Sequence, residues 1–72
     1  MAEFKYEITQ NLGVLSEGKS SSKKVNYISY NDRSPKLDIR DWLNDGDKMG
    51  KGITLTNDEA KVLRDILNNL EL

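Results

Sequence analysis

A short alternating tract followed by a glycine-rich turn constrains the fold of this chain more than any other feature. Residues 36–43, Lys-Leu-Asp-Ile-Arg-Asp-Trp-Leu, alternate with the period of two that is typical of a half-buried β-strand. A turn rich in Gly and Asp follows, and residues 50–55 form a second strand. We therefore expect an antiparallel pair of strands. The first has Leu37, Ile39 and Asp41 on one face and Lys36, Asp38, Arg40 and Trp42 on the other.

Two more strands are predicted upstream. Residues 4–8 alternate, and residues 12–15 continue that strand after a bulge at 11–13. Residues 16–22 include Gly18 and three consecutive serines, which predict an exposed turn. Residues 25–30 are rich in β-branched and aromatic side chains and predict a strand that ends in a turn at 31–35. The whole chain then contains four strands.

The last part of the sequence predicts one helix. Thr56 and Glu59 have the spacing of a capping box, so the helix should begin at Asn57. Its apolar residues recur on one stripe, Leu63, Ile66, Leu67 and Leu70, which we expect to cover the sheet face that carries Leu37, Ile39, Ile53 and Leu55. Val62 and Leu72 fall outside this stripe. A homodimer that buries them and a sheet edge is the expected assembly.

Composition limits the classes of function. The chain has 72 residues, which predicts one small domain, 1–72, of marginal stability. It has no Cys and no His, which excludes disulfides and thiolate zinc sites and removes the usual neutral-pH base. Residues 46–52 miss the spacing of a phosphate-binding loop by one residue. We therefore expect no enzymatic activity, no cofactor or metal and no small-molecule substrate.

The sequence also bears on location. It contains no apolar stretch near the roughly 20 residues of a membrane span, and its first residues lack the apolar core of a signal peptide. We expect no membrane contact and a cytoplasmic protein, with association with the nucleoid as the alternative.

The charges are placed unevenly. The formal net charge is −1, but residues 19–51 carry +3 and the flanks together carry −4. A basic centre is compatible with one cationic face, and a solvated surface of mixed sign is the plain alternative. Cations beside an indole on one sheet face suit a single nucleic acid strand, because they offer charges to phosphates and a flat surface to bases.

Two points of this face stay open at the level of sequence. Trp42 is either an exposed stacking platform or a core residue at a strand end. The strand at 25–30 has two orientations that differ by one residue, and we favour the one in which Ile28 and Tyr30 point to the helix. Asp38 is expected to orient Arg40 or a lysine across the sheet.

The residues at 36–42, the Gly-Asp-Lys-Met-Gly-Lys-Gly-Ile-Thr-Leu run at 46–55 and the Thr-Asn-Asp-Glu helix start carry a resemblance. They resemble the single-stranded DNA-binding domain of the transcriptional coactivator positive cofactor four (PC4-like), and still more its short bacterial relatives of the YdbC type. The resemblance extends over about 25–70. It implies a β-β-β-β-α fold of the α+β class, a homodimer, and curved sheets that bind single-stranded DNA with little sequence preference.

The resemblance also implies a set of binding residues. Arg40 would contact phosphate and Trp42 would stack on a base. The Gly-Lys-Gly entry to the next strand would supply Lys51, with Lys48 in the turn before it. Together with the exposed cations and strand-two residues, the expected nucleic-acid-binding set is Lys23, Lys24, Tyr27, Ser29, Asn31, Arg33, Lys36, Arg40, Trp42, Lys48 and Lys51. The turn at 31–35 is less basic than in the coactivator. Single-stranded RNA binding and a protein-interaction module are the alternative functions.

Overall fold

The computed structural model describes residues 5–43 and 48–72 of the chain. The elements follow in the order β1 (Tyr6–Glu17), β2 (Ser21–Tyr30), β3 (Lys36–Leu43), β4 (Lys48–Leu55) and α1 (Asn57–Asn68). Neighbouring strands pair antiparallel in one sheet of order β1-β2-β3-β4. The predicted α+β class, four strands followed by a C-terminal helix, is confirmed. The predicted strand position Phe4 and the turn at 44–47 lie outside the described residues.

The first two strands are longer than expected. Only residues 18–20 separate β1 from β2, and the Gly18 N–H donates to the Ser21 carbonyl oxygen at 2.7 Å. The pairing of β1 with β2 shifts register three times, and one shift lies between Asn11 and Gly13, where the sequence predicted a bulge. Each bulge bends and twists the strand that carries it. The edge strand is therefore strongly curved.

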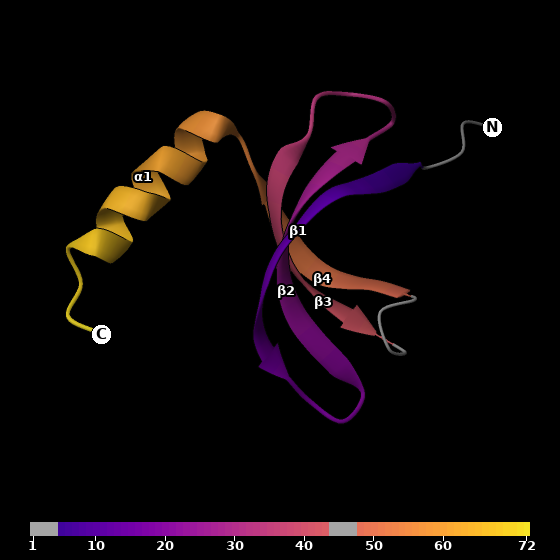
Figure 1. Cartoon of the computed structure of the whole chain (residues 1–72), viewed down its shortest axis with the longest axis horizontal. Coiled ribbons are helices and arrows are strands. Elements are labelled where there is room, and N and C mark those ends of the chain that lie inside the picture. Colours follow the sequence, from indigo (N-terminus) through magenta and orange to yellow (C-terminus); the bar gives the residue numbers. More distant parts are fainter. Residues whose placement is uncertain (1–4, 44–47) are drawn as a thin grey trace.

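The sheet has a concave and a convex face (Figure 1). Its strands diverge from a narrow waist, and α1 lies on the convex side. Register assigns side chains to the faces, because residues directly opposite each other in an antiparallel pair point the same way. Asn26 pairs with Asp38, and Ile28 pairs with Lys36. These residues share the concave face, whereas Tyr27 pairs with Leu37 on the convex face.

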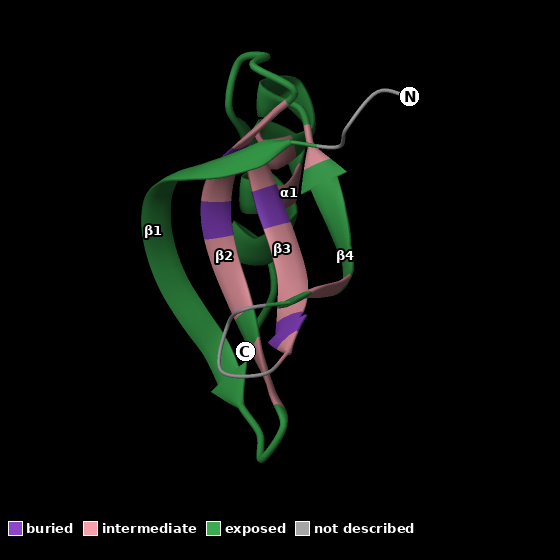
Figure 2. Ribbon diagram, turned by 90° about the vertical axis from the view of Figure 1, so that its right-hand side faces the viewer, coloured by how far each residue is buried: buried purple, intermediate pink, exposed green. Residues whose placement is uncertain are grey.

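The core lies in the concavity. Among the described residues, the buried side chains are Asn26, Ile28, Asp38 and Trp42, with exposures of 0–2%. All four belong to β2 and β3, the central strands, where Figure 2 shows the buried positions in purple. Two of these four are polar, so this core depends on hydrogen bonds as well as on apolar contact.

The helix begins as predicted but does not cover the sheet. The Thr56 hydroxyl accepts from the Glu59 N–H at 3.1 Å, and the Glu59 carboxylate accepts from the Thr56 N–H at 2.8 Å. No residue of α1 is buried, and Ile66 and Leu70 are about half exposed. The expectation that the helical stripe covers the sheet is therefore wrong, because α1 projects away from β3 and β4 (Figure 1). Within the described ranges, no helix is long and apolar enough to cross a membrane.

The turn between β2 and β3 is tight. Asn31 and Asp32 have φ values of 51° and 63°, in the left-handed region that Asn and Asp tolerate better than most residues. The Arg33 N–H donates to the Tyr30 carbonyl oxygen at 3.0 Å, which closes the turn. The predicted turn at 31–35 is confirmed, and it places Arg33 beside the end of the concave face.

Candidate nucleic-acid interface

A pocket opens where the β2–β3 turn meets the sheet. Its volume is about 320 Å³, and its lining residues come from β2, the turn, β3 and β4: Tyr30, Arg33, Ser34, Lys36, Arg40, Met49 and Thr54. Three of them are cations, and three carry hydroxyl groups. Cations around one opening form a suitable surface for a phosphate group.

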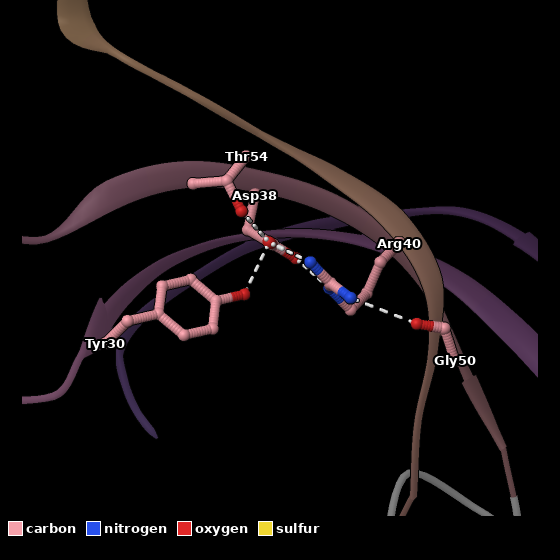
Figure 3. Close-up of polar contacts among 5 residues, drawn as sticks. All are labelled: Tyr30, Asp38, Arg40, Gly50 and Thr54. Carbon is pink, nitrogen blue, oxygen red and sulfur yellow. Dashed lines mark hydrogen bonds and ion pairs between the residues drawn. The ribbon is translucent and has the colours of Figure 1, made fainter. Parts of the chain in front are cut away.

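A buried carboxylate organises one wall of this pocket (Figure 3). The carboxylate of Asp38 is 0% exposed and accepts from the Tyr30 hydroxyl at 2.7 Å and from the Thr54 hydroxyl at 2.9 Å. Arg40 donates to it twice, from Nε at 2.7 Å and from Nη2 at 2.8 Å. This two-point ion pair fixes the plane of the guanidinium group.

The guanidinium of Arg40 is held on its other side as well. Its Nη1 donates to the Gly50 carbonyl oxygen at 3.0 Å, and its side chain is 14% exposed. Three of the five N–H donors of a guanidinium are thus engaged by Asp38 and Gly50. Arg40 is therefore an oriented donor whose charge Asp38 largely balances.

Protonation of the network follows from these contacts. Burial alone would raise the pKa of Asp38, but hydrogen bonds from Arg40, Tyr30 and Thr54 outweigh it and lower that pKa. Burial, followed by the hydrogen bond to Asp38, raises the pKa of Tyr30. The hydrogen bond to Asp38 raises the pKa of Arg40. At neutral pH the network holds a carboxylate, a phenol and a guanidinium cation.

The glycines of β4 make room for this arrangement. A Cβ atom on Gly52, which pairs with Arg40, would overlap Arg40 Cβ. A Cβ on Gly50 would lie 2.9 Å from the Asp41 carbonyl oxygen. The Gly-Lys-Gly run, read in the sequence as the source of a phosphate-binding lysine, thus also lets β4 approach β3 closely.

Trp42 is not exposed. Its exposure is 2%, and the Tyr6 ring lies beside it with ring centroids 5.9 Å apart. The expectation of an exposed indole is therefore wrong for this structure, because a residue of β1, far away in sequence, covers it. The alternative of a buried residue at a strand end describes its position.

The favoured orientation of the second strand is also wrong. The Tyr30 hydroxyl bonds to Asp38 on the concave face, and Tyr27 lines a cavity with Ala60 and Arg64 of α1. Tyr27 and Ser29 thus lie on the convex face, and the amide oxygen of Asn31 in the turn accepts from the Lys5 N–H. Both faces of β2 carry apolar and aromatic residues, so hydrophobicity could not choose between them.

The structure brings some of the predicted cations together and separates others. Lys24 pairs with Arg40 and shares the concave face, to which the pocket adds Arg33 and Lys36. Lys23 pairs with Asp41 and Lys48 pairs with Leu43, both on the convex face. Lys51 is exposed at the register shift in β4. Four predicted cations therefore line or adjoin one concave surface: Lys24, Arg33, Lys36 and Arg40.

Sequence reasoning missed several residues of this surface. Thr54 and Tyr30 complete the Asp38 network, and Met49 lines the pocket opposite Trp42. Asn26 is 1% exposed, and its side-chain nitrogen has no hydrogen-bond partner among the described residues. Asn26 is a polar residue inside a segment of β-forming residues, and this was the sequence signal available for it. The alternation of side chains that places Asp38 on the concave face would also have placed Thr54 there.

A curved four-stranded antiparallel sheet followed by one helix, with an oriented arginine and a buried tryptophan on its concave side, defines a class of α+β domains. Within it, the sequence model of the family described as Transcriptional Coactivator p15 (PC4) matches residues 18–66. An uncharacterized protein of Treponema pallidum (strain Nichols) is 49% identical over 71 residues, covering 97% of this chain and 84% of that protein. The chain belongs to the PC4 family, as the resemblance implied, and it has a bacterial relative.

Proposed function

We propose that this chain binds single-stranded DNA without catalysing a reaction, through the concave face of its sheet and as a homodimer. The observation that carries the proposal is the cationic pocket next to the Asp38–Arg40 ion pair. Membership of the PC4 family, whose description is that of a transcriptional coactivator, supports it. The process served is transcription, replication or repair.

Attachment is electrostatic. Lys24, Arg33 and Lys36 bring charge to the concave side, and each phosphate they neutralise releases counterions. Arg40 contributes oriented hydrogen-bond donors more than net charge, because the carboxylate of Asp38 compensates its positive charge. Lys51, which is exposed on the edge strand β4, adds a further contact. The register directs Lys23, Tyr27, Ser29 and Lys48 to the convex face, and Asn31 bonds to Lys5 in the turn, so the proposal assigns no contact to these five residues.

Binding should show little sequence preference. Cations read the backbone, which is the same for every sequence, and an aromatic ring stacks on any base. A duplex should compete poorly, because its bases are already stacked. Whether a ribose hydroxyl is tolerated decides between DNA and RNA.

The convex side supports the homodimer. A groove of about 390 Å³ between β4 and α1 is almost wholly apolar, with Ile53, Val62 and Ile66 each more than half exposed. A 72-residue chain with so small a core gains stability when a second copy covers this groove. Each copy would then keep its own concave face open to nucleic acid.

The test is a titration of labelled oligothymidylate, oligouridylate and duplex DNA at several salt concentrations. We expect the tightest binding for oligothymidylate, with log K falling against log salt by about 0.7 per phosphate neutralised. Tighter binding of oligouridylate would assign the protein to RNA. Equal and negligible binding of all three would contradict the proposal and, with intact salt-insensitive dimers, would favour a protein-interaction module.

A further inference from the structure

One sulfur atom lies beside the cations of the concave face. Met49, near the start of β4, pairs with Trp42 of β3 and lines the cationic pocket of about 320 Å³. Its side chain is half-buried and borders this open pocket, which small solutes can enter. The chain has no cysteine, and its second methionine, Met1, lies outside the described residues. Among the described residues, Met49 therefore carries the one sulfur atom that an oxidant can modify.

A peroxide oxidises a thioether by transferring one oxygen atom. The sulfur lone pair attacks a peroxide oxygen, the O–O bond breaks, and hydrogen peroxide leaves behind the sulfoxide and one molecule of water. Sulfur is oxidised and the peroxide is reduced, with no further reactant. A flexible apolar side chain thereby becomes polar, and methionine sulfoxide reductases reverse the change.

The pocket offers donors to a sulfoxide oxygen. Arg33 and Lys36 line it, and neither side chain has a hydrogen bond or an ion pair among the described residues. Arg40 lines it too, but three of its N–H donors already have partners. A sulfoxide on Met49 would therefore share one hollow with two cationic side chains whose donors are unused.

A sulfoxide and a phosphate need the same partners. The oxygen atoms of both groups only accept hydrogen bonds, and the side chains of arginine and lysine only donate them. A sulfoxide oxygen that bonds to Arg33 or Lys36 leaves fewer donors for a phosphate. The negative end of the S–O dipole also repels a phosphate that approaches the pocket.

We propose that Met49 is a modification site, and that its reversible oxidation by a peroxide weakens nucleic acid binding at the concave face. The inference rests on the proposed function and adds a regulation to it. Trp42, which is also sensitive to oxidants, is 2% exposed and is therefore protected. Oxidation of this face should be confined to Met49.

The experiment compares binding before and after oxidation of the full chain. The protein is treated with hydrogen peroxide, peptide mass mapping locates the added oxygen, and labelled oligothymidylate is titrated at fixed salt. We expect the dissociation constant to rise about fivefold or more, the effect of losing about one hydrogen bond to a charged group. Methionine sulfoxide reductase should restore the original value. Tryptophan fluorescence should show that the oxidised chain stays folded.

Two variants assign the effect to the position of the sulfur. Met49→Leu keeps an apolar side chain of similar volume that peroxide does not oxidise, so its own dissociation constant should be the same before and after treatment. Adding Asn68→Met to this variant moves the thioether to the last residue of α1. This matched control should take up oxygen at its new methionine without a change in binding. Met1 is present in every chain, so its oxidation cancels from the comparison.

The proposal fails if Met49 resists peroxide, if oxidised protein binds oligothymidylate as before, or if the oxidised chain unfolds. It fails equally if either variant loses as much affinity on treatment as the parent chain does, because the effect would then not depend on Met49. In all these cases, salt-dependent binding by the untreated parent chain would leave the proposed function standing. An untreated chain that binds no oligothymidylate would remove both.

Discussion

The two faces of the sheet differ in how far the chain covers them by itself. The concave face holds all four buried side chains of the described residues and a carboxylate with four hydrogen bonds. The convex face, with α1, leaves Ile53, Val62 and Ile66 more than half exposed. A polar, internally bonded face is ready for a charged ligand, whereas an open apolar face needs a protein surface.

The two faces of this small chain therefore differ in role. The orientation of Arg40 depends on contacts within one chain, so the proposed nucleic acid site needs no second copy to position this side chain. The helix contributes little to the core of its own chain. Stability should therefore respond to changes on the concave face, and assembly should respond to changes on the convex face.

The largest expected effect is on stability, from Asp38→Ala. The change leaves Arg40 partly buried without its partner and removes the acceptor of Tyr30 and Thr54. We expect the free energy of unfolding to fall by about 3–5 kcal/mol, the usual cost of breaking a buried ion pair. Urea unfolding at one fixed protein concentration measures it. A loss below about 1 kcal/mol would mean that the network does not hold the concave face together.

The next effect is on assembly, from Ile66→Glu. A carboxylate in the groove between β4 and α1 would have to be buried in the dimer, which should raise its dissociation constant about 30-fold or more. Analytical ultracentrifugation measures the constant, with Asn68→Glu as the charge-matched control elsewhere on α1. Equal dissociation constants for both variants would place the dimer interface elsewhere.

A smaller effect is expected in acid. The pKa of folded Asp38 lies below its unfolded value of about 3.9, so its stabilisation is complete above that value and is lost as pH falls through the lower folded pKa. Asp38→Asn should lack this part of the acid dependence. Urea unfolding from pH 6 to pH 2 compares the two chains. Parallel curves over that range would contradict the lowered pKa.

The smallest effect concerns one charge. Lys36→Gln removes a cation from the pocket, so the slope of log K against log salt for oligothymidylate should become shallower by about 0.7. Lys61→Gln removes a cation from α1 and should leave the slope unchanged. If both variants change the slope equally, nucleic acid does not distinguish the two faces.

Local patterns predicted much of this fold. The alternation at 36–43 assigned the faces of β3, including the place of Asp38 beside Arg40, and the capping box located the start of α1. Both features depend on residues close together in sequence. The class of the fold and the family followed from the same stretch.

The misplaced parts depend on long-range contacts. β2 has apolar side chains on both faces, so only its pairing with β3 decides that Ile28 lies inward. Trp42 is buried because Tyr6 returns over it from the other end of the sheet. The local sequence period does not show whether a helix packs its apolar stripe on its own sheet. The stripe can also remain exposed on its own chain, because a second chain can complete the packing.

The central claim is that nucleic acid occupies the concave face, and amide chemical-shift mapping tests it most directly. Labelled protein is titrated with oligothymidylate, and shifts of backbone amides and of the single indole N–H are followed. We predict the largest shifts at Tyr30, Arg33, Lys36 and Arg40 and at the Trp42 indole, with little change at Tyr27, Ile53 and along α1. Shifts concentrated on Ile53 and α1, with the Trp42 indole unchanged, would contradict it.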